Sequence, residues 1–167
     1  MGKHLQHRFF KNVVYNLTNL LGYVIIVEKG ENMEQLLCLL IVIQRVAKEI
    51  HYRAFGENFW SDHLLADTVF DGLEYFMYEI QENYFMCEEE ANPYQKRIYT
   101  YASSMMPESW GSVKELFEIL DGFVLQTILQ ATELSKASDI TAADSDLLGR
   151  ICGDLQQKHG FLAKRLK

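Results

Sequence analysis

The chain has 167 residues, of which 49% are apolar and 23% are charged, a composition typical of one globular domain with a sizeable core. Its longest wholly apolar run, residues 36–43, falls short of the roughly 20 residues that cross a bilayer, and the N-terminus lacks a signal-peptide pattern. The formal net charge is −7, although both ends of the chain carry cations without acids. The three cysteines have no paired spacing, so we expect a cytoplasmic protein with reduced thiols and no membrane span.

Helical patterns are expected in the first half of the chain. Residues 5–22 carry apolar side chains at helical spacing, so we expect residues 1–31 to form an N-terminal extension that is partly helical. Asn32 and Gln35 make a capping-box pattern before a helix at 33–54, which is apolar on nearly all sides and should be buried. Gly56 marks a turn, and a long continuous helix is expected from residue 58 to about residue 90.

The second half of the chain predicts a long connection and two more helices. Both prolines fall within residues 91–109, where we expect a connection with at most one short helical turn. Ser112 and Glu115 form a capping box for a helix at 112–136, and Thr141 caps a last helix at 142–166. Residues 32–167 therefore predict an all-α, ferritin-like four-helix bundle with a long crossover between its second and third helices.

Two histidines and two acids near the turn suggest a metal site. His51 and His63 are twelve residues apart, Asp67 follows by one helical turn, and Glu82 lies fifteen residues further on. Imidazole and carboxylate together suit a first-row metal such as iron. On one continuous helix Asp67 and Glu82 are roughly 22 Å apart, so one ion cannot bind both within one chain. Either these residues are ordinary packing residues, or a second copy of the chain completes the site.

Helical phase adds detail to this prediction. His63 and Asp67 are one turn apart and face the same side of a helix. On a continuous helix Asp67, Tyr78 and Glu82 would lie within roughly 60° of one another, whereas Glu79 would point about 100° away from Tyr78. A polar stripe through an otherwise apolar helix needs a partner, because buried carboxylates are costly unless they are paired or bound to metal.

The segment from residue 51 to residue 82 resembles the Dps family, the ferritin-like proteins named as DNA-binding proteins from starved cells. The resemblance covers residues 32–90 and 138–166. The matching positions are His51-Tyr52, Gly56, Asn58-Phe59, His63-x-x-x-Asp67 and Tyr78-x-x-x-Glu82, followed in the last helix by Thr141, Asp146-Leu147-Leu148, Asp154-Leu155, Lys158 and Phe161-Leu162.

The resemblance implies a hollow homo-dodecamer that oxidises Fe(II) with peroxide or dioxygen, stores ferric iron and protects DNA. It implies iron ligands His51, His63 and Asp67 from one chain and Glu82 from its neighbour. It also implies acidic three-fold pores at the start of the last helix, for which the candidates are Asp139, Asp144 and Asp146. Acids in that position are also ordinary helix N-terminal residues.

One departure from the family pattern bears on activity. Tyr78 stands where the family has an aspartate, which removes one carboxylate. A phenol is a poor ligand for Fe(II), although it can bind Fe(III) as phenolate, so the site is expected to hold one iron more readily than two. The chain is accordingly a candidate ferroxidase, or alternatively a non-catalytic ferritin-like assembly that acts as a DNA-binding or scaffold particle. A third reading is a four-helix binding protein without metal or cage.

The basic ends of the chain are candidates for weak, non-specific DNA binding. Twelve copies would multiply weak contacts, while the acidic body would oppose them and make binding sensitive to salt. The alternative is that terminal cations serve solubility and the C-terminal dipole of the last helix. The candidates are Lys3, Arg8, Lys11, Lys164, Arg165 and Lys167.

Overall fold

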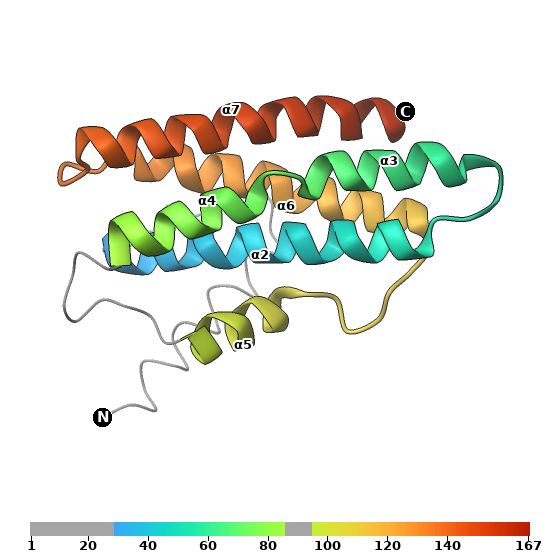
Figure 1. The fold of residues 1–167 in the computed structure, drawn as a ribbon, viewed down its shortest axis with the longest axis horizontal. Helices are drawn as coiled ribbons and strands as arrows, with labels where there is room; N and C mark the ends of the chain where they lie inside the picture. Colours follow the sequence, from blue (N-terminus) through green and yellow to red (C-terminus); the bar gives the residue numbers. More distant parts are fainter. Residues whose placement is uncertain (1–28, 86–94) are drawn as a thin grey trace.

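The computed structural model describes residues 29–85 and 95–167, and within these ranges every regular element is helical (Figure 1). The expected helix at 5–22, and Lys3, Arg8 and Lys11 with it, lie outside the described residues. The elements are α2 (Lys29–Arg53), η1 (Gly56–Asn58), α3 (Phe59–Phe70), α4 (Leu73–Glu79), the π-helical η2 (Ile80–Phe85), α5 (Gln95–Met105), α6 (Val113–Leu134) and α7 (Ala142–Arg165).

Four rods pack into a bundle around one apolar core. In Figure 1, α2 and α6 lie side by side, and α7 runs along both α3 and α4, which together form one rod. Contacts between α2 and α3, α2 and α6, and α6 and α7 complete the bundle. The predicted all-α, ferritin-like four-helix bundle with a long crossover between its second and third rods is therefore confirmed.

Helix α2 is the centre of the core, as its sequence predicts. Between Met33 and Ile43 every side chain except Glu34 is buried. The expected start of this helix is wrong, however, because α2 begins at Lys29 and Asn32 lies inside it rather than capping it. Asparagine and glycine lower helix stability by at most about 1 kcal/mol each, so a few such residues do not stop a helix whose next turns are buried.

The predicted continuous helix from residue 58 to residue 90 is also wrong. Helix α3 ends at Phe70 and is separate from α4 (Figure 1), because Asp71 adopts an extended conformation with φ −60° and ψ 136°. Gly72 then takes the left-handed conformation, with φ 77°, before α4 begins. Glycine reaches this region without steric cost, and other residues rarely do. The rod therefore changes direction between Asp67 and Tyr78.

The crossover contains a real helix rather than a single turn. Helix α5 has eleven residues and packs on α2 through Ile98, Tyr101, Ala102 and Met105, which are all buried. Their spacing of three, one and three residues is the helical signal that the two nearby prolines obscured.

Both predicted capping boxes are present at the helices that follow. At α6 the Ser112 hydroxyl accepts a hydrogen bond from the Glu115 backbone N–H at 3.3 Å, and the Glu115 carboxylate accepts one from the Ser112 N–H at 2.6 Å. Thr141 and Asp144 form the same pair at α7. Among the described residues, no helix is long and apolar enough to cross a membrane.

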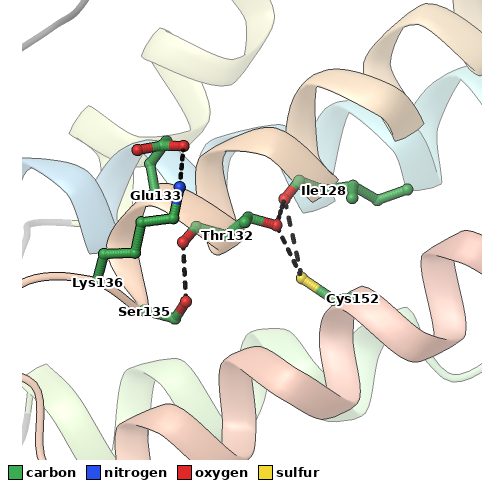
Figure 2. Close-up of polar contacts among 6 residues, drawn as sticks. All are labelled: Ile128, Thr132, Glu133, Ser135, Lys136 and Cys152. Atoms are coloured by element: carbon green, nitrogen blue, oxygen red, sulfur yellow. Dashed lines mark hydrogen bonds and ion pairs between the residues drawn. The ribbon is translucent and has the colours of Figure 1, made fainter.

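Local hydrogen bonds secure the end of α6 where it meets α7 (Figure 2). The Thr132 hydroxyl donates to the Ile128 carbonyl at 2.7 Å, and Ser135 donates to the Thr132 carbonyl at 2.8 Å. Cys152 of α7, a free and half-buried thiol, lies 3.8 Å from both the Thr132 hydroxyl and the Ile128 carbonyl oxygen. The Ser135 hydroxyl thereby satisfies the Thr132 carbonyl, one of the groups that the last turn of a helix leaves without an intrahelical backbone partner.

Candidate metal centre

Three of the four predicted ligands converge within one chain. One ligand atom from each of His51, His63 and Asp67 lies within 4.8 Å of the others, and all three side chains are half-buried. His51 Nδ1 contacts the Asp67 carboxylate directly. The His51 and His63 rings stack with their centroids 3.7 Å apart and an interplanar angle of 33°. Two imidazoles and a carboxylate at this separation could hold a first-row metal ion.

The turn after α2 produces this convergence. His51 lies in the last turn of α2, and Gly56, with φ 72°, reverses the chain so that α3 packs back along α2. The reversal brings His63, in the second turn of α3, beside His51. Asp67 follows one turn later on the same side of α3, as its spacing predicts.

A backbone carbonyl fixes the tautomer of His63. His63 Nδ1 lies 3.2 Å from the carbonyl oxygen of His51. A carbonyl oxygen only accepts hydrogen bonds, so this nitrogen carries a proton and donates it. The other ring nitrogen, Nε2, is left available as the metal ligand. A hydrogen bond of this kind is the usual way in which proteins orient a ligating histidine.

Tyr78 and Glu82 form a pair of their own on α4 and η2. The Tyr78 phenol donates a hydrogen bond to the Glu82 carboxylate, and this bond raises the pKa of Tyr78 above its ordinary value. Both side chains are exposed, and Glu82 is not part of the cluster of His51, His63 and Asp67. Glu82 therefore lies outside the intrachain site, as helical rise alone indicates.

Asp67, Tyr78 and Glu82 do not lie on one straight helix, as the predicted polar stripe requires. The break at Asp71 and Gly72 and the π-helical turn of η2 both alter the helical phase between Asp67 and Glu82. Glu79, one residue from Tyr78, instead faces α7 and forms two hydrogen bonds with Arg150 at 2.7 and 3.0 Å. Glu79 is thus committed to a salt bridge and does not replace the missing carboxylate.

An exposed apolar surface surrounds the histidines. The Tyr52 ring contacts His51 edge-on, and the Trp60 ring contacts His63 in the same way. Trp60 is 69% exposed, and Phe55, in the turn beside them, is 80% exposed. Leu64 extends this surface along α3. We call the three aromatic side chains, Tyr52, Phe55 and Trp60, the aromatic rim. Large apolar side chains that are exposed together on one surface often mark an interaction site, whereas single exposed apolar side chains are ordinary.

The predicted pore acids have local partners. Asp144 belongs to the capping box of α7, and Asp146 forms an ion pair with Arg150 at 3.0 Å. Asp139 is exposed in the turn before α7. These positions agree with the ordinary reading of acids at a helix N-terminus, and their role in a pore stays a prediction.

Of the C-terminal cations, Lys164 and Lys167 are exposed, but Arg165 is not a free tail residue. The Arg165 guanidinium forms two hydrogen bonds, at 2.6 and 3.0 Å, with the carboxylate of Asp62, which is buried. These bonds raise the pKa of Arg165 above its ordinary value. Arg165 therefore forms an ion pair within the fold, and its role in DNA binding stays a prediction.

Sequence reasoning missed a row of cations on α7. Arg150, Lys158 and Arg165 are spaced by eight and seven residues, so they lie within about 80° of one another on the helix. Each contacts a different part of the α3–α4 rod: Arg150 contacts Glu79, Lys158 contacts the Asp71 carbonyl, and Arg165 contacts Asp62. We call these three residues the α7 basic stripe. Their heptad-like spacing was the available signal.

No protein-family model matches the sequence, and no curated protein matches it. Three solved structures are similar in fold. Dps from Thermosynechococcus elongatus has a TM-score of 0.69 and 19% identity over 83% of this chain and 90% of that one. A mutant of Dps1 from Mycobacterium smegmatis has a TM-score of 0.67 and 16% identity over 83% and 95%. Dps from Microbacterium arborescens in its high iron form has a TM-score of 0.64 and 14% identity over 87% and 99%. The chain therefore has the fold of the Dps proteins.

Proposed function

We propose that this protein is a Dps-like cage that binds and oxidises Fe(II) at sites between its subunits. The observation that carries this proposal is the convergence of His51, His63 and Asp67 within 4.8 Å at the end of α2. Neutral imidazole suits Fe(II), and carboxylate stabilises Fe(III). A fold shared with Dps proteins supports the same conclusion.

A second copy of the chain completes the site in this proposal. Glu82 is exposed and outside the intrachain cluster, so it is available to a neighbouring molecule. The aromatic rim gives the neighbour an apolar surface to cover next to the histidines. In a two-fold arrangement each chain offers the same surface, so two equivalent sites form at one interface. We propose a dodecamer because the resemblance to the Dps family implies one.

The redox chemistry follows from the ligands. Fe(II) gives up one electron and becomes Fe(III), which two carboxylates, Asp67 and Glu82, stabilise through their charge. One hydrogen peroxide molecule takes two electrons and two protons and becomes two waters, so it consumes two Fe(II) ions. If each site holds one iron at a time, the two electrons come from Fe(II) ions at two sites or from two Fe(II) ions oxidised one after the other at the same site. The ferric product then collects inside the cage, which we assign to the cytoplasm.

Anaerobic titration with Fe(II), followed by peroxide, tests the proposal. The wild-type protein should bind Fe(II) and produce ferric absorbance after peroxide is added. His63→Ala and Asp67→Asn should each abolish tight binding and this rapid phase. His159→Ala is the matched control, because His159 pairs with Asp121 on the α6–α7 side of the bundle and touches none of the proposed ligands. Equal ferric traces in the wild type and in both site variants would refute the proposal.

A non-catalytic assembly is the second candidate, and Tyr78 favours it. The phenol replaces a carboxylate in the family pattern and is hydrogen-bonded to Glu82, so it weakens the ligand set on that side of the site. Such a particle would act as a scaffold or would coat DNA through Lys164 and Lys167, which are exposed. A native mass of a large assembly, with iron bound but not oxidised, would support this candidate. A plasmid mobility shift lost in Lys164→Gln, Lys167→Gln would assign DNA binding to these lysines.

A further inference from the structure

We propose that Lys158 is a positioning residue for the metal site, because it fixes the direction in which the second half of the α3–α4 rod carries Glu82. This inference rests on the proposed function, in which Glu82 of one copy completes the site of another. His63 and Asp67 precede the break in the rod, and Tyr78 and Glu82 follow it. The angle at the break therefore decides where one set of ligands lies relative to the other.

The break leaves the Asp71 carbonyl without its helical hydrogen bond. Among the described residues, only a side chain of α7 donates to it. The Asp71 N–H still donates to the Asp67 carbonyl at 2.9 Å, which ends α3. The Tyr75 N–H, which would donate to the Asp71 carbonyl in a continuous helix, donates instead to the Gly72 carbonyl at 3.2 Å. The Lys158 ammonium takes over and donates to the Asp71 carbonyl at 2.6 Å.

Lys158 is held firmly enough to define this geometry. Only 4% of the residue is exposed, although it carries a charge. Its ammonium also lies 2.7 Å from the Asp154 carboxylate, one turn earlier on α7. A buried lysine is costly unless its charge is paired and hydrogen-bonded. Asp154 and the Asp71 carbonyl meet both conditions, so the ammonium has one favourable position.

The two other members of the α7 basic stripe hold the rod on either side of the break. Arg165 binds Asp62, which directly precedes His63 on α3. Arg150 binds Glu79, which directly follows Tyr78 on α4. One rigid helix thus contacts the rod before, at and after its break. The three contacts together set the orientation of η2 relative to α3 within each chain.

Symmetry turns this intrachain relation into site geometry. In a two-fold dimer the same α3-to-η2 relation holds in both chains, so it determines where each Glu82 arrives beside the partner's histidines. Bound ligands tolerate errors of only about 0.5 Å before affinity suffers. A change in the break angle should therefore remove Glu82 from the coordination sphere while the intrachain cluster of His51, His63 and Asp67 persists.

A double-mutant cycle on the full-length protein tests this idea, with Co(II) as an air-stable probe whose visible spectrum reports its coordination. Lys158→Met and Glu82→Gln should each weaken Co(II) binding by about 10- to 100-fold, the usual effect of disturbing a ligand's support. The double variant should be no weaker than Glu82→Gln alone, and both single variants should give the same altered spectrum. Lys114→Met, at an exposed lysine on α6, is the matched control and should match the wild type.

Two results would overturn the inference. Additive losses in the double variant would mean that Lys158 acts on stability rather than through Glu82, and unchanged Co(II) binding in Lys158→Met would mean that it does not act at all. If Lys158→Met does not fold, Lys158→Arg enters the cycle with the same two readings. If the His63→Ala variant binds Co(II) as tightly as the wild type does, the proposed function itself is refuted. The two failures are therefore distinguishable.

Discussion

The guanidinium of Arg165 binds the carboxylate of Asp62 through two hydrogen bonds, from Nε at 2.6 Å and from Nη2 at 3.0 Å. This pair joins the end of α7 to the first turn of α3, directly beside His63. The Asp62 side chain is only 5% exposed, whereas that of Arg165 is 29% exposed. The fold therefore depends on the cation to compensate a buried negative charge.

Replacement of Arg165 should destabilise the protein strongly. Arg165→Met leaves the Asp62 carboxylate buried without its partner, and we expect a loss of about 3 kcal/mol in the free energy of unfolding, the lower end of the cost of stranding a buried charge. Asp62→Leu combined with Arg165→Met should recover most of this loss. Urea denaturation of both variants, with Lys164→Met as control, measures the difference. If Arg165→Met lowers the free energy of unfolding no more than Lys164→Met does, the ion pair of Arg165 and Asp62 contributes nothing to stability.

The left-handed glycine at the break gives a second stability prediction. Gly72→Ala should cost about 1–2 kcal/mol, because alanine is strained at φ 77° although no atom lies within 4 Å of the added Cβ. Gly149→Ala is a matched control in the middle of α7, where a Cβ also meets open space. There the substitution should stabilise the protein by up to about 1 kcal/mol. Thermal unfolding of the two variants should therefore shift in opposite directions, and shifts of equal sign would contradict the assigned backbone conformations.

Restoring the missing carboxylate should change the iron stoichiometry. Tyr78→Asp supplies an anionic ligand next to Glu82, so the number of Fe(II) ions bound per site should rise from one toward two, and ferric absorbance after peroxide should appear faster. Tyr75→Asp is the control, because Tyr75 is on the same helix and similarly exposed, at 61% against 58% for Tyr78. Calorimetric titration with Fe(II) under nitrogen counts the ions. Equal stoichiometry in the wild type and Tyr78→Asp would exclude Tyr78 as the cause of a reduced site.

Cys38 makes stability depend on alkaline pH. Burial, with a smaller contribution from the Glu34 carboxylate, raises the pKa of this thiol from 9.0 to about 12. The unfolded chain ionises Cys38 near pH 9 and the folded chain near pH 12, so its contribution is complete below pH 9 and is lost as pH rises toward 12. Unfolding free energies between pH 8 and pH 11 should fall more steeply in the wild type than in Cys38→Ala. Equal slopes in the wild type and Cys38→Ala would exclude Cys38 as the source of this pH dependence.

Local signals predicted much of the fold. The capping boxes at Ser112 and Thr141 define helix starts through neighbours three residues away, and both are present. The apolar run of α2 required burial whatever its partners were. His63 and Asp67 lie on one side of α3 because their spacing is one helical turn. In each case the sequence signal lies within a few residues, even where the contacts that follow are distant.

The parts that were not predicted depend on distant partners. An isolated glycine is tolerated inside many helices, so Gly72 alone does not predict a break, and the lysine that satisfies the Asp71 carbonyl lies 87 residues away. Arg165 looked like a tail cation because its partner, Asp62, lies 103 residues earlier. Tertiary contacts of this kind leave only a faint trace in sequence, here the spacing of the α7 basic stripe.

The joint at Gly72 also divides a long rod into pieces that cannot persist alone. Helix α3 has twelve residues, and α4 has seven residues that continue into the six of η2, whereas an isolated helix shorter than about 12–15 residues is marginal in water. Both pieces owe their order to what α7 and α2 supply. We therefore expect amide protons flanking Gly72 to exchange with solvent more readily than those in the middle of α2, α6 and α7.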